Sequence, residues 1–367
     1  MARRALVVGI NRYDLPGMTE LRAAASDARA IADLLAKNAD GTDNWEVIRE
    51  IDAGKGIRAN RLERALHRLL HPEFGSTKHP APTADDELLI YFSGHAETGL
   101  LGGTRLATSE GSGIPFNDLL EGVHRSPAKA ITILLDCCLS GAVGNDFPSF
   151  GNDPTRHDRA IIREGLTILT ACRPGEEAVE HLLVDSRRRA RPAGAFTRFL
   201  VAGLKGACAD VLGEITAFDL YAYAAQGFVR SPAEQRPMLK SHVTHDSPIR
   251  RADATIDIGV LTTITDFFPD KEATVTLTPA HDHDPDDPTS LSRVDKDTPY
   301  QKFTGSAVQR EFDHLKAYRD AGLVSSSDGS DFALCCRDRK TVELTALGDY
   351  YWDLVTTGTI TAAGAHH

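Results

Sequence analysis

The 367-residue sequence lacks several features that would place it in a class of protein. It has no apolar run of the roughly 18 residues that a transmembrane helix needs, so we expect no membrane span. Its start, MARRALVVGINRY, holds only a short β-type apolar run, which is typical of a core strand and not of a signal peptide. It has no basic excess either. The formal net charge of -11 argues against a protein whose whole surface binds nucleic acid or an anionic membrane.

Cysteine is scarce, with six residues in the whole chain. No CxxC motif with a partner His or Cys occurs, and the pairs Cys137–Cys138 and Cys335–Cys336 are adjacent, a spacing that rarely suits a disulfide framework. We therefore expect free thiols and a reducing, cytoplasmic setting.

Strand-like and helix-like segments alternate along the first two thirds of the chain. The predicted strands are apolar throughout, which is typical of a parallel sheet whose two faces are both covered by helices. The sequence therefore predicts an α/β fold with a mostly parallel central sheet and helices on both faces. The predicted strands are residues 5–10, 45–52, 87–95, 131–138 and 165–172, and the predicted helices begin near residue 26 and span 57–70 and 195–206.

The composition also predicts the domain organisation. Residues 300–357 run from a helix through a hairpin-like segment at 331–345 into a second helix, an order that resembles a winged helix-turn-helix domain, small and α+β. The expected parts are a first domain at 1–250 with exposed loops at 142–164 and 185–194, a connecting segment at 251–299 with an acidic linker at 280–290, the winged-helix-like domain at 300–357, and a flexible tail at 358–367.

Two predicted strands end in residues that carry chemistry. ELLIYFSGH ends in His95, and LLDCCLSG contains Cys137 and Cys138. If these strands are neighbours in a parallel sheet, both side chains open at the same edge. A cysteine protease needs a thiolate nucleophile, a histidine that moves a proton, and backbone donors for an oxyanion. The residues alone leave open which cysteine reacts.

The chain resembles the caspase-like cysteine peptidases, and within them the bacterial and metacaspase-type branch. The resemblance implies a caspase-like fold and cysteine endopeptidase activity, and it covers about residues 4–240. It rests on the stretches ALVVGINRY, LRAAASDARAI, LLIYFSGHA, ILLDCCLSG, GLTILTACRPGEEAVE and GAFTRFLVAGLKG, which occur in the family's order.

The usual cysteine motif of this family is Asp-x-Cys-His-Ser-Gly. Laid on this sequence, it implies that Cys138 is the nucleophile and His95 the general base and acid, while Cys137 faces the core as a small hydrophobe. It also implies oxyanion donors at the backbone N–H groups of Cys138 and Ala96. Leu139 replaces the usual His and Ala96 a frequent Gly, but neither change removes a group that the mechanism needs. Ala96 would be unsuitable as an oxyanion donor only if its backbone required a positive φ.

The resemblance also implies a specificity. In the metacaspase branch, two acids line the S1 pocket, and Asp27 and Asp136 stand at their positions, with Ser93 beside them. Two carboxylates favour a guanidinium or an ammonium, so we expect cleavage after Arg and then Lys. Self-cleavage in one of the chain's own predicted loops could activate it. The candidate residues are Arg156, Arg159, Arg163, Arg187, Arg188, Arg189 and Arg191.

Each assignment has a structural alternative. His95 could hydrogen-bond a loop, Asp136 could cap a following helix, and Asp27 could cap the first helix together with Ser26. The HDHD stretch at 281–284 has the ligand types for a metal, but its acidic, Pro-bounded context is typical of a solvated spacer. We expect no metal and no cofactor. Metacaspases are often activated by calcium, but the chain offers no matched carboxylate cluster, only Glu97, Glu110, Asn145 and Asp146.

The leading hypothesis is a cysteine endopeptidase that cleaves protein substrates after basic residues. We expect a regulated zymogen, and the resemblance implies a role in bacterial stress or defence. The 300–357 domain mixes basic and acidic residues, so we expect it to dock an activating or inhibitory protein and not DNA. One alternative is a catalytically inactive caspase-like scaffold. The other is a DNA-binding regulator that acts through the winged helix.

Overall fold

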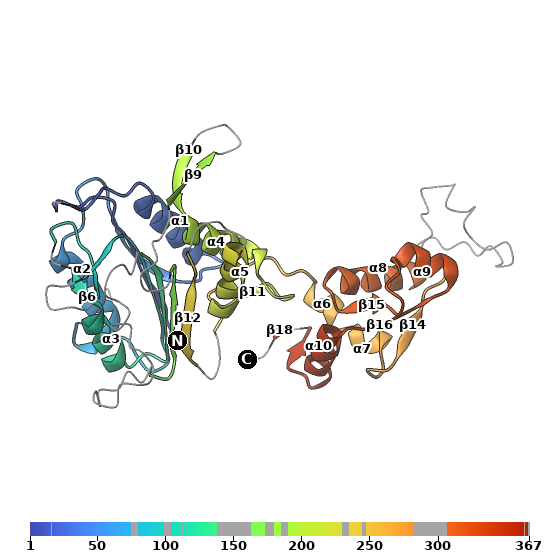
Figure 1. Ribbon diagram of the computed structural model, residues 1–367. Coiled ribbons are helices and arrows are strands. Elements are labelled where there is room, and N and C mark those ends of the chain that lie inside the picture. Colours follow the sequence, from blue (N-terminus) through green and yellow to red (C-terminus); the bar gives the residue numbers. More distant parts are fainter. Residues whose placement is uncertain are drawn as a thin grey trace, which may run out of the picture. The chain divides into compact units, whose positions relative to one another are not determined.

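The computed structural model describes residues 1–15, 17–74, 80–98, 104–111, 113–137, 163–172, 180–184, 190–229, 235–243, 247–281, 307–362 and 364–365. The chain forms two compact units (Figure 1). The first contains Met1–Ala209 and Gly213–Asp253, and the second contains Asp210–Leu212 and Ala254–His367.

A six-stranded sheet forms the centre of the first unit, in the order β12-β8-β7-β3-β1-β2. Neighbouring strands are parallel except at the edge, where β12 runs antiparallel to β8. The predicted mostly parallel sheet is therefore confirmed, while β12 was not foreseen. The strands are β1 (Arg3–Gly9), β2 (Glu46–Ile51), β3 (Glu87–Ser93), β7 (Ala130–Asp136), β8 (Leu166–Thr170) and β12 (Met238–His242).

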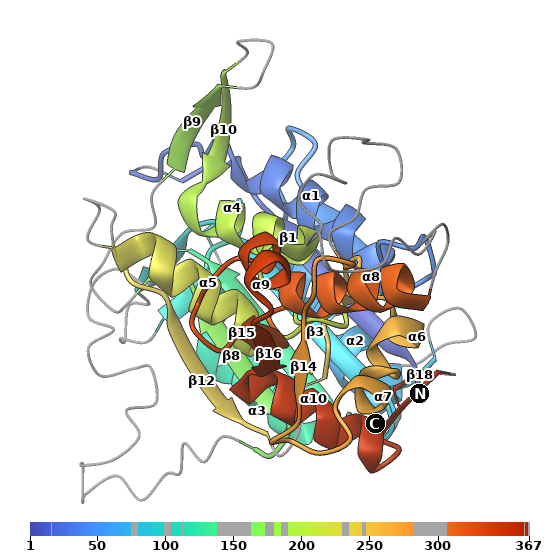
Figure 2. The ribbon, with the colours of Figure 1, turned by 90° about the vertical axis from the view of Figure 1, so that its right-hand side faces the viewer.

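Helices cover both faces of this sheet, as the views in Figures 1 and 2 show. Successive strand side chains point to opposite faces, so Leu6 and Val8 belong to one buried cluster and Ala5 and Val7 to the other. Both faces are apolar because each packs against helices. The first cluster includes α2 (Ala59–Leu70) and α3 (Phe116–Arg125), and the second includes α1 (Ala24–Ala36), α4 (Ala195–Ala202) and α5 (Ala217–Val229).

Smaller elements surround the sheet. The predicted exposed loop at 185–194 is only partly correct, because Ala190–Gly194 forms β10, which pairs antiparallel with β9 (Glu180–Val184). Figure 2 shows this hairpin beside α1 and α4, which both contact β10. The remaining elements are β4 (Ala96–Thr98), β5 (Thr104–Leu106), β6 (Ile114–Pro115), the 3-10 turn Pro72–Phe74, the π-helical turn Gly203–Ala207, β11 (Glu214–Ile215) and β13 (Arg250–Arg251).

The second unit has a buried core of its own. Its strand β14 (Thr274–Thr276) pairs with β16 (Thr341–Leu344), so much of the segment 251–299, which we expected to be a connector, belongs to this unit. His281, expected in a solvated linker, is also buried, and its Nδ1 accepts the N–H of Thr278. The other elements are α6 (Ile258–Leu261), α7 (Ile264–Phe267), α8 (Ala307–Asp320), β15 (Val324–Ser326), α9 (Phe332–Asp338), α10 (Ala346–Thr356), β17 (Ile360–Thr361) and β18 (Gly364–Ala365).

The expected hairpin at 331–345 is wrong in its first half. Asp331 accepts the N–H of Leu334 and so caps α9, on which Phe332, Cys335 and Cys336 are all buried. Their i, i+3, i+4 spacing is the helical period, which β-type side chains obscured. The second half is a strand as expected, because β16 pairs antiparallel with β15.

Candidate active site

His95 lies directly after β3, at the carboxyl edge of the sheet. Its backbone N–H donates to the hydroxyl of Tyr13 at 2.8 Å, and the two rings lie 4.8 Å apart. Its Nε2 lies 2.9 Å from the carbonyl oxygen of Thr19. Because a carbonyl only accepts, Nε2 carries the proton in this bond, and Nδ1 is the acceptor when the ring is neutral. This bond therefore fixes the orientation of the imidazole ring and the tautomer of its neutral form.

Tyr13 is a site residue that the sequence did not reveal as one. It is buried, and burial raises the pKa of its phenol above the usual range, so the hydroxyl stays protonated. That hydroxyl donates to the carbonyl of Ile10 and accepts from His95. Tyr13 thus fixes the backbone that carries the histidine. Its only signal in the sequence was its place just after the first strand.

Replacing Tyr13 with phenylalanine should leave the N–H of His95 without its acceptor. We expect the free energy of unfolding to fall by about 1 kcal/mol, the ordinary net value of such a bond. If the chain is catalytic, kcat should fall more than KM rises, because the histidine loses its alignment. Chemical denaturation and steady-state kinetics measure both, with Tyr221→Phe on α5 as the control for loss of a tyrosine hydroxyl. Unchanged stability and kcat would remove Tyr13 from the site.

Asp52 anchors the loop that carries Tyr13. The carboxylate is buried at the end of β2 and accepts the backbone N–H groups of Asn11 and Arg12. Burial raises the pKa of this carboxyl, but backbone bonds from Arg12, Gly56 and other residues outweigh it and hold the pKa below its usual range. The loop is thereby tied to the sheet edge, which places Tyr13 next to His95.

Two buried carboxylates meet near the same edge. Asp136 ends β7 and is the register partner of Ser93 on β3. Asp27 comes from the first turn of α1 and accepts the N–H of Gly194 at 2.8 Å. A side-chain carbon on Gly194 would lie 2.5 Å from Oδ2 of Asp136 and 3.0 Å from Oδ2 of Asp27. The two acids are therefore adjacent, although 109 residues of sequence separate them.

The alternative in which Asp27 caps α1 together with Ser26 does not match the structure. The N–H of Ala25 in the first turn donates to the side-chain oxygen of Asn11, while Ser26 donates to the carbonyl of Ala23 and Asp27 accepts from Gly194. The alternative in which Asp136 caps a helix concerns a segment outside the described residues.

The structure describes some of the remaining predicted site residues and not others. Ser93 is buried beside Asp136. Ala96 lies in the extended strand β4, and among the described residues Arg339 is the one non-glycine residue with a positive φ. Cys137 is buried in the core, as expected. Cys138 lies outside the described residues, as do Arg156, Arg159, Arg187, Arg188 and Arg189.

Arg163 is a correction. We expected it in an exposed, cleavable loop, but its guanidinium donates to the carbonyls of Val123, Ser126 and Ala128. These groups lie in or just beyond the last turn of α3, where a cation is favoured. A protease would have to break all of these bonds before it could accept Arg163 as P1. Arg191 also differs from expectation, because its backbone belongs to β10.

The thiols of Cys208 and Cys335 are poor nucleophiles. Burial, followed by the charge of Asp219, raises the pKa of Cys208 to about 12, and burial also raises the pKa of Cys335. In the part of the chain that the structure describes, no three His, Cys, Asp or Glu residues gather as a metal site would need. Nor does that part contain a helix both long and apolar enough to span a membrane.

One of three comparisons with known proteins identifies a family. A family model for the caspase domain matches residues 2–247, which includes the sheet from β1 to β12 and every predicted catalytic residue. No curated protein matches the sequence significantly. A solved protein from Geobacter sulfurreducens is 14% identical with a TM-score of 0.47, over 69% of this chain and 100% of that one. Caspase-1 from Spodoptera frugiperda is 13% identical with a TM-score of 0.43, over 68% and 90%.

Proposed function

The chain belongs to the caspase domain family, which implies cysteine-type peptidase activity, and from that premise we propose that it is a metacaspase-type endopeptidase that cleaves after arginine and, less readily, after lysine. The observation that carries the specificity is the pair of buried carboxylates, Asp27 and Asp136, which meet at Gly194. A buried acid pair favours a cationic partner, and arginine can bind it through two parallel hydrogen bonds.

We assign the chemistry to Cys138 and His95. The thiolate of Cys138 attacks the carbonyl carbon after the P1 residue, while backbone N–H groups of Cys138 and Ala96 receive the developing oxyanion. His95 takes the thiol proton and returns it to the leaving amine, and water then hydrolyses the thioester. Support comes from the edge geometry. The N–H of Gly94, just before His95, donates to the carbonyl of Asp136 at 3.3 Å, so the histidine segment lies beside the end of the strand that leads to Cys138.

A panel of fluorogenic peptides that differ only at P1 tests this function. We expect hydrolysis after Arg, slower hydrolysis after Lys and none after Asp, because an acidic P1 side chain would face two carboxylates. The assay runs with and without calcium on the full chain. Preferred cleavage after Asp or after an apolar residue would refute the proposed specificity while leaving the peptidase class intact.

We also propose that the enzyme is made as a zymogen and that it works in the reducing cytoplasm. The sequence supports a reducing compartment, because it has no CxxC motif with a partner and its adjacent cysteine pairs rarely suit a disulfide framework. Arg156, Arg159, Arg187, Arg188, Arg189 and Arg191 remain the candidates for self-cleavage. Mass spectrometry of the active protein should find a new amino terminus directly after one of them, and none after Arg163.

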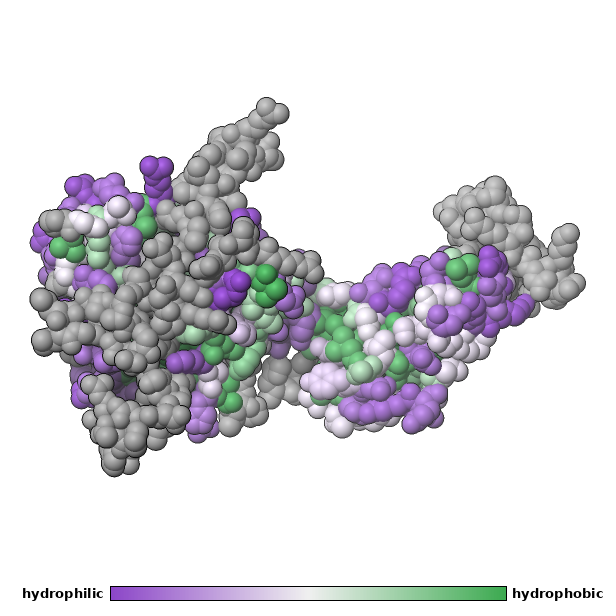
Figure 3. Space-filling model, in the orientation of Figure 1, coloured by the Kyte–Doolittle hydropathy of each residue, from purple (hydrophilic) through white to green (hydrophobic). Residues whose placement is uncertain are grey.

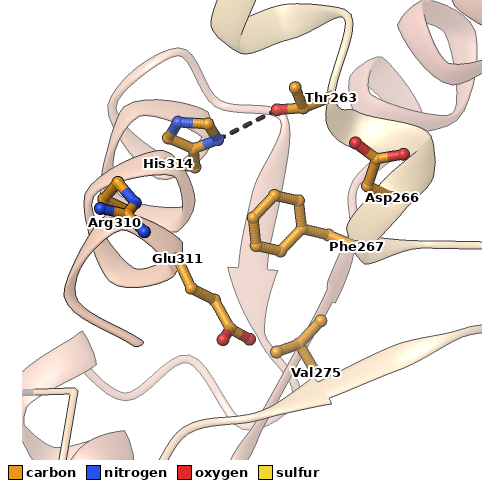
Figure 4. A pocket seen from close by; sticks show the side chains of 7 residues that line it. All are labelled: Thr263, Asp266, Phe267, Val275, Arg310, Glu311 and His314. Carbon is orange, nitrogen blue, oxygen red and sulfur yellow. Dashed lines mark hydrogen bonds between the residues drawn. The ribbon is translucent and has the colours of Figure 1, made fainter. Parts of the chain in front are cut away.

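For the second unit we propose a winged-helix-like module that docks a regulatory protein. The order α8, β15, α9, β16 and α10, with β15 and β16 paired antiparallel, supports the resemblance. A cavity of about 480 Å³ in this unit supports docking (Figure 4). It is lined from α7, β14 and α8 by Thr263, Asp266, Phe267, Val275, Arg310, Glu311 and His314.

The lining of this cavity favours a protein segment over a nucleic acid. Figure 4 shows the ring of Phe267 between the hydrogen-bonded pair Thr263 and His314 on one side and Glu311 and Val275 on the other. The carboxylates of Asp266 and Glu311 would repel phosphates. Hydrophobic residues also lie between hydrophilic ones on the face of this unit seen in Figure 3.

A further inference from the structure

Gly194, at the junction of β10 and α4, is a glycine that its own backbone does not require. Its φ of -61° and ψ of 133° are values that any residue adopts. There is no space for a side chain at this position. The first carbon of a side chain would lie 2.5 Å from Asp136 Oδ2 and 3.0 Å from Asp27 Oδ2, and both carboxylates are buried. The absence of a side chain at Gly194 is therefore what lets the two acids meet.

The junction of β10 and α4, residues 194–197, also holds both carboxylates by hydrogen bonds; we call this junction with Asp27 and Asp136 the corner. The N–H of Gly194 donates to Oδ2 of Asp27 at 2.8 Å. One turn later, the hydroxyl of Thr197 donates to Oδ2 of Asp136.

The bond from Thr197 to Asp136 fixes the role of a buried tyrosine behind it. The hydroxyl oxygens of Tyr91 and Thr197 lie 2.6 Å apart. The hydroxyl of Thr197 has one proton and donates it to Asp136, so Tyr91 must be the donor in its hydrogen bond with Thr197. Burial, and then the charges of Asp136 and Asp27, raise the pKa of Tyr91 well above its usual range, so its proton is always present. Tyr91 therefore donates to Thr197, and Thr197 donates to Asp136. The direction of these two hydrogen bonds cannot reverse while Asp136 is ionised, because a carboxylate only accepts.

We propose that Gly194 and Thr197 are positioning residues that set the spacing and direction of Asp27 and Asp136 for the flat guanidinium of a P1 arginine. The inference rests on the proposed function and names what determines its specificity. A guanidinium donates along two fixed directions in one plane, whereas an ammonium is a point charge on a flexible stem. A corner that fixes two carboxylates therefore favours arginine over lysine.

The first test replaces Gly194 with alanine. The new methyl group displaces the carboxylates, and kcat/KM for a P1-Arg peptide should fall about a hundredfold, the usual effect of an ångström-scale misplacement. The fall for P1-Lys should be clearly smaller, so the preference for Arg over Lys decreases. Gly122→Ala on α3 is the matched control, because its added carbon meets the ends of the Leu70 and His71 side chains, at 3.2 and 3.3 Å, away from the carboxylates. It should leave both values unchanged.

The second test separates the hydroxyl of Thr197 from its shape. Thr197→Val keeps the branched shape but removes the donor to Asp136. The acid limb of the pH profile of kcat/KM should then move to higher pH, because a lost donor favours the protonated carboxyl. Thr197→Ser restores the donor and should return the profile to that of the wild type. A purely structural role of Thr197 would give no shift in the pH profile.

Binding of agmatine, a small guanidinium compound, tests the corner without catalysis. Calorimetry should find binding to the wild type and to Gly122→Ala, and much weaker binding to Gly194→Ala and Thr197→Val. If agmatine binds but no peptide is cleaved, even after cleavage of the chain in the 142–164 or 185–194 segment, the proposed peptidase function is refuted and the role of Gly194 and Thr197 stays supported. The positioning role of Gly194 and Thr197 is refuted if Gly194→Ala binds agmatine and cleaves the P1-Arg peptide like the wild type. It is also refuted if the wild type does not bind agmatine, or if Arg and Lys turnover fall equally together with the melting temperature.

Discussion

Replacing Cys138 with alanine is expected to lower kcat/KM for a P1-Arg peptide by roughly 10⁴-fold or more, the scale seen when a protease loses its nucleophile. We expect none of the described cysteines to substitute for it. Cys137 is 1% exposed and packs in the core, and Cys172 is buried with its thiol donating to the carbonyl of Cys137. Steady-state hydrolysis by purified protein measures the loss.

The neighbouring residue provides the matched control. Cys137→Ala should keep kcat/KM within about threefold of the wild type, because it changes only core packing, and its main effect should be on stability, about 1 kcal/mol. Loss of activity in Cys137→Ala with activity retained in Cys138→Ala would reverse the assignment of the nucleophile. If neither the wild type nor any variant hydrolyses the peptide, the scaffold alternative is favoured, unless cleavage in the 142–164 or 185–194 segment then restores turnover.

Neutralising Asp27 is the second large effect. Asp27→Asn keeps the size of the side chain and an oxygen that can accept from Gly194, but removes the charge. We expect kcat/KM for P1-Arg to fall roughly 30-fold or more, which corresponds to about 2 kcal/mol, the lower end for breaking a buried charge pair. The loss should appear mainly in KM, because the pocket binds substrate and transition state alike.

The same helix supplies the control for this change. Asp33 also lies on α1, but its side chain is exposed and pairs with Arg49. Asp33→Asn should therefore leave KM unchanged. Asp136→Asn should reproduce the effect of Asp27→Asn, and combining the two should lose less than the sum because the acids share one ligand. Equal behaviour of Asp27→Asn and Asp33→Asn would remove Asp27 from the pocket.

The errors of sequence interpretation share a cause. The hairpin assigned to 331–345 failed because Phe332 and two cysteines suit a strand as readily as a helix, and the cap at Asp331 decided the outcome. Arg163 was read as a loop arginine because nothing near it in sequence reveals that α3 needs a cation at its end. The segment before residue 277 resembles a connector in sequence because β14 is short and its partner strand lies far along the chain. Thr276 of β14 pairs with Thr341 of β16, 65 residues later.

The sequence by itself determined the parallel sheet and the ends of its strands, because an apolar run and the residue that terminates it are local properties of the chain. That is why His95 and Asp136 could be located at the sheet edge before any coordinates. Only the tertiary structure decided what surrounds them. Tyr13 meets His95 across 82 residues, Thr19 meets it across 76, and Gly194 meets Asp27 across 167. Contacts over such separations leave no periodic pattern, because they depend on how packed helices and strands bring distant loops to one edge.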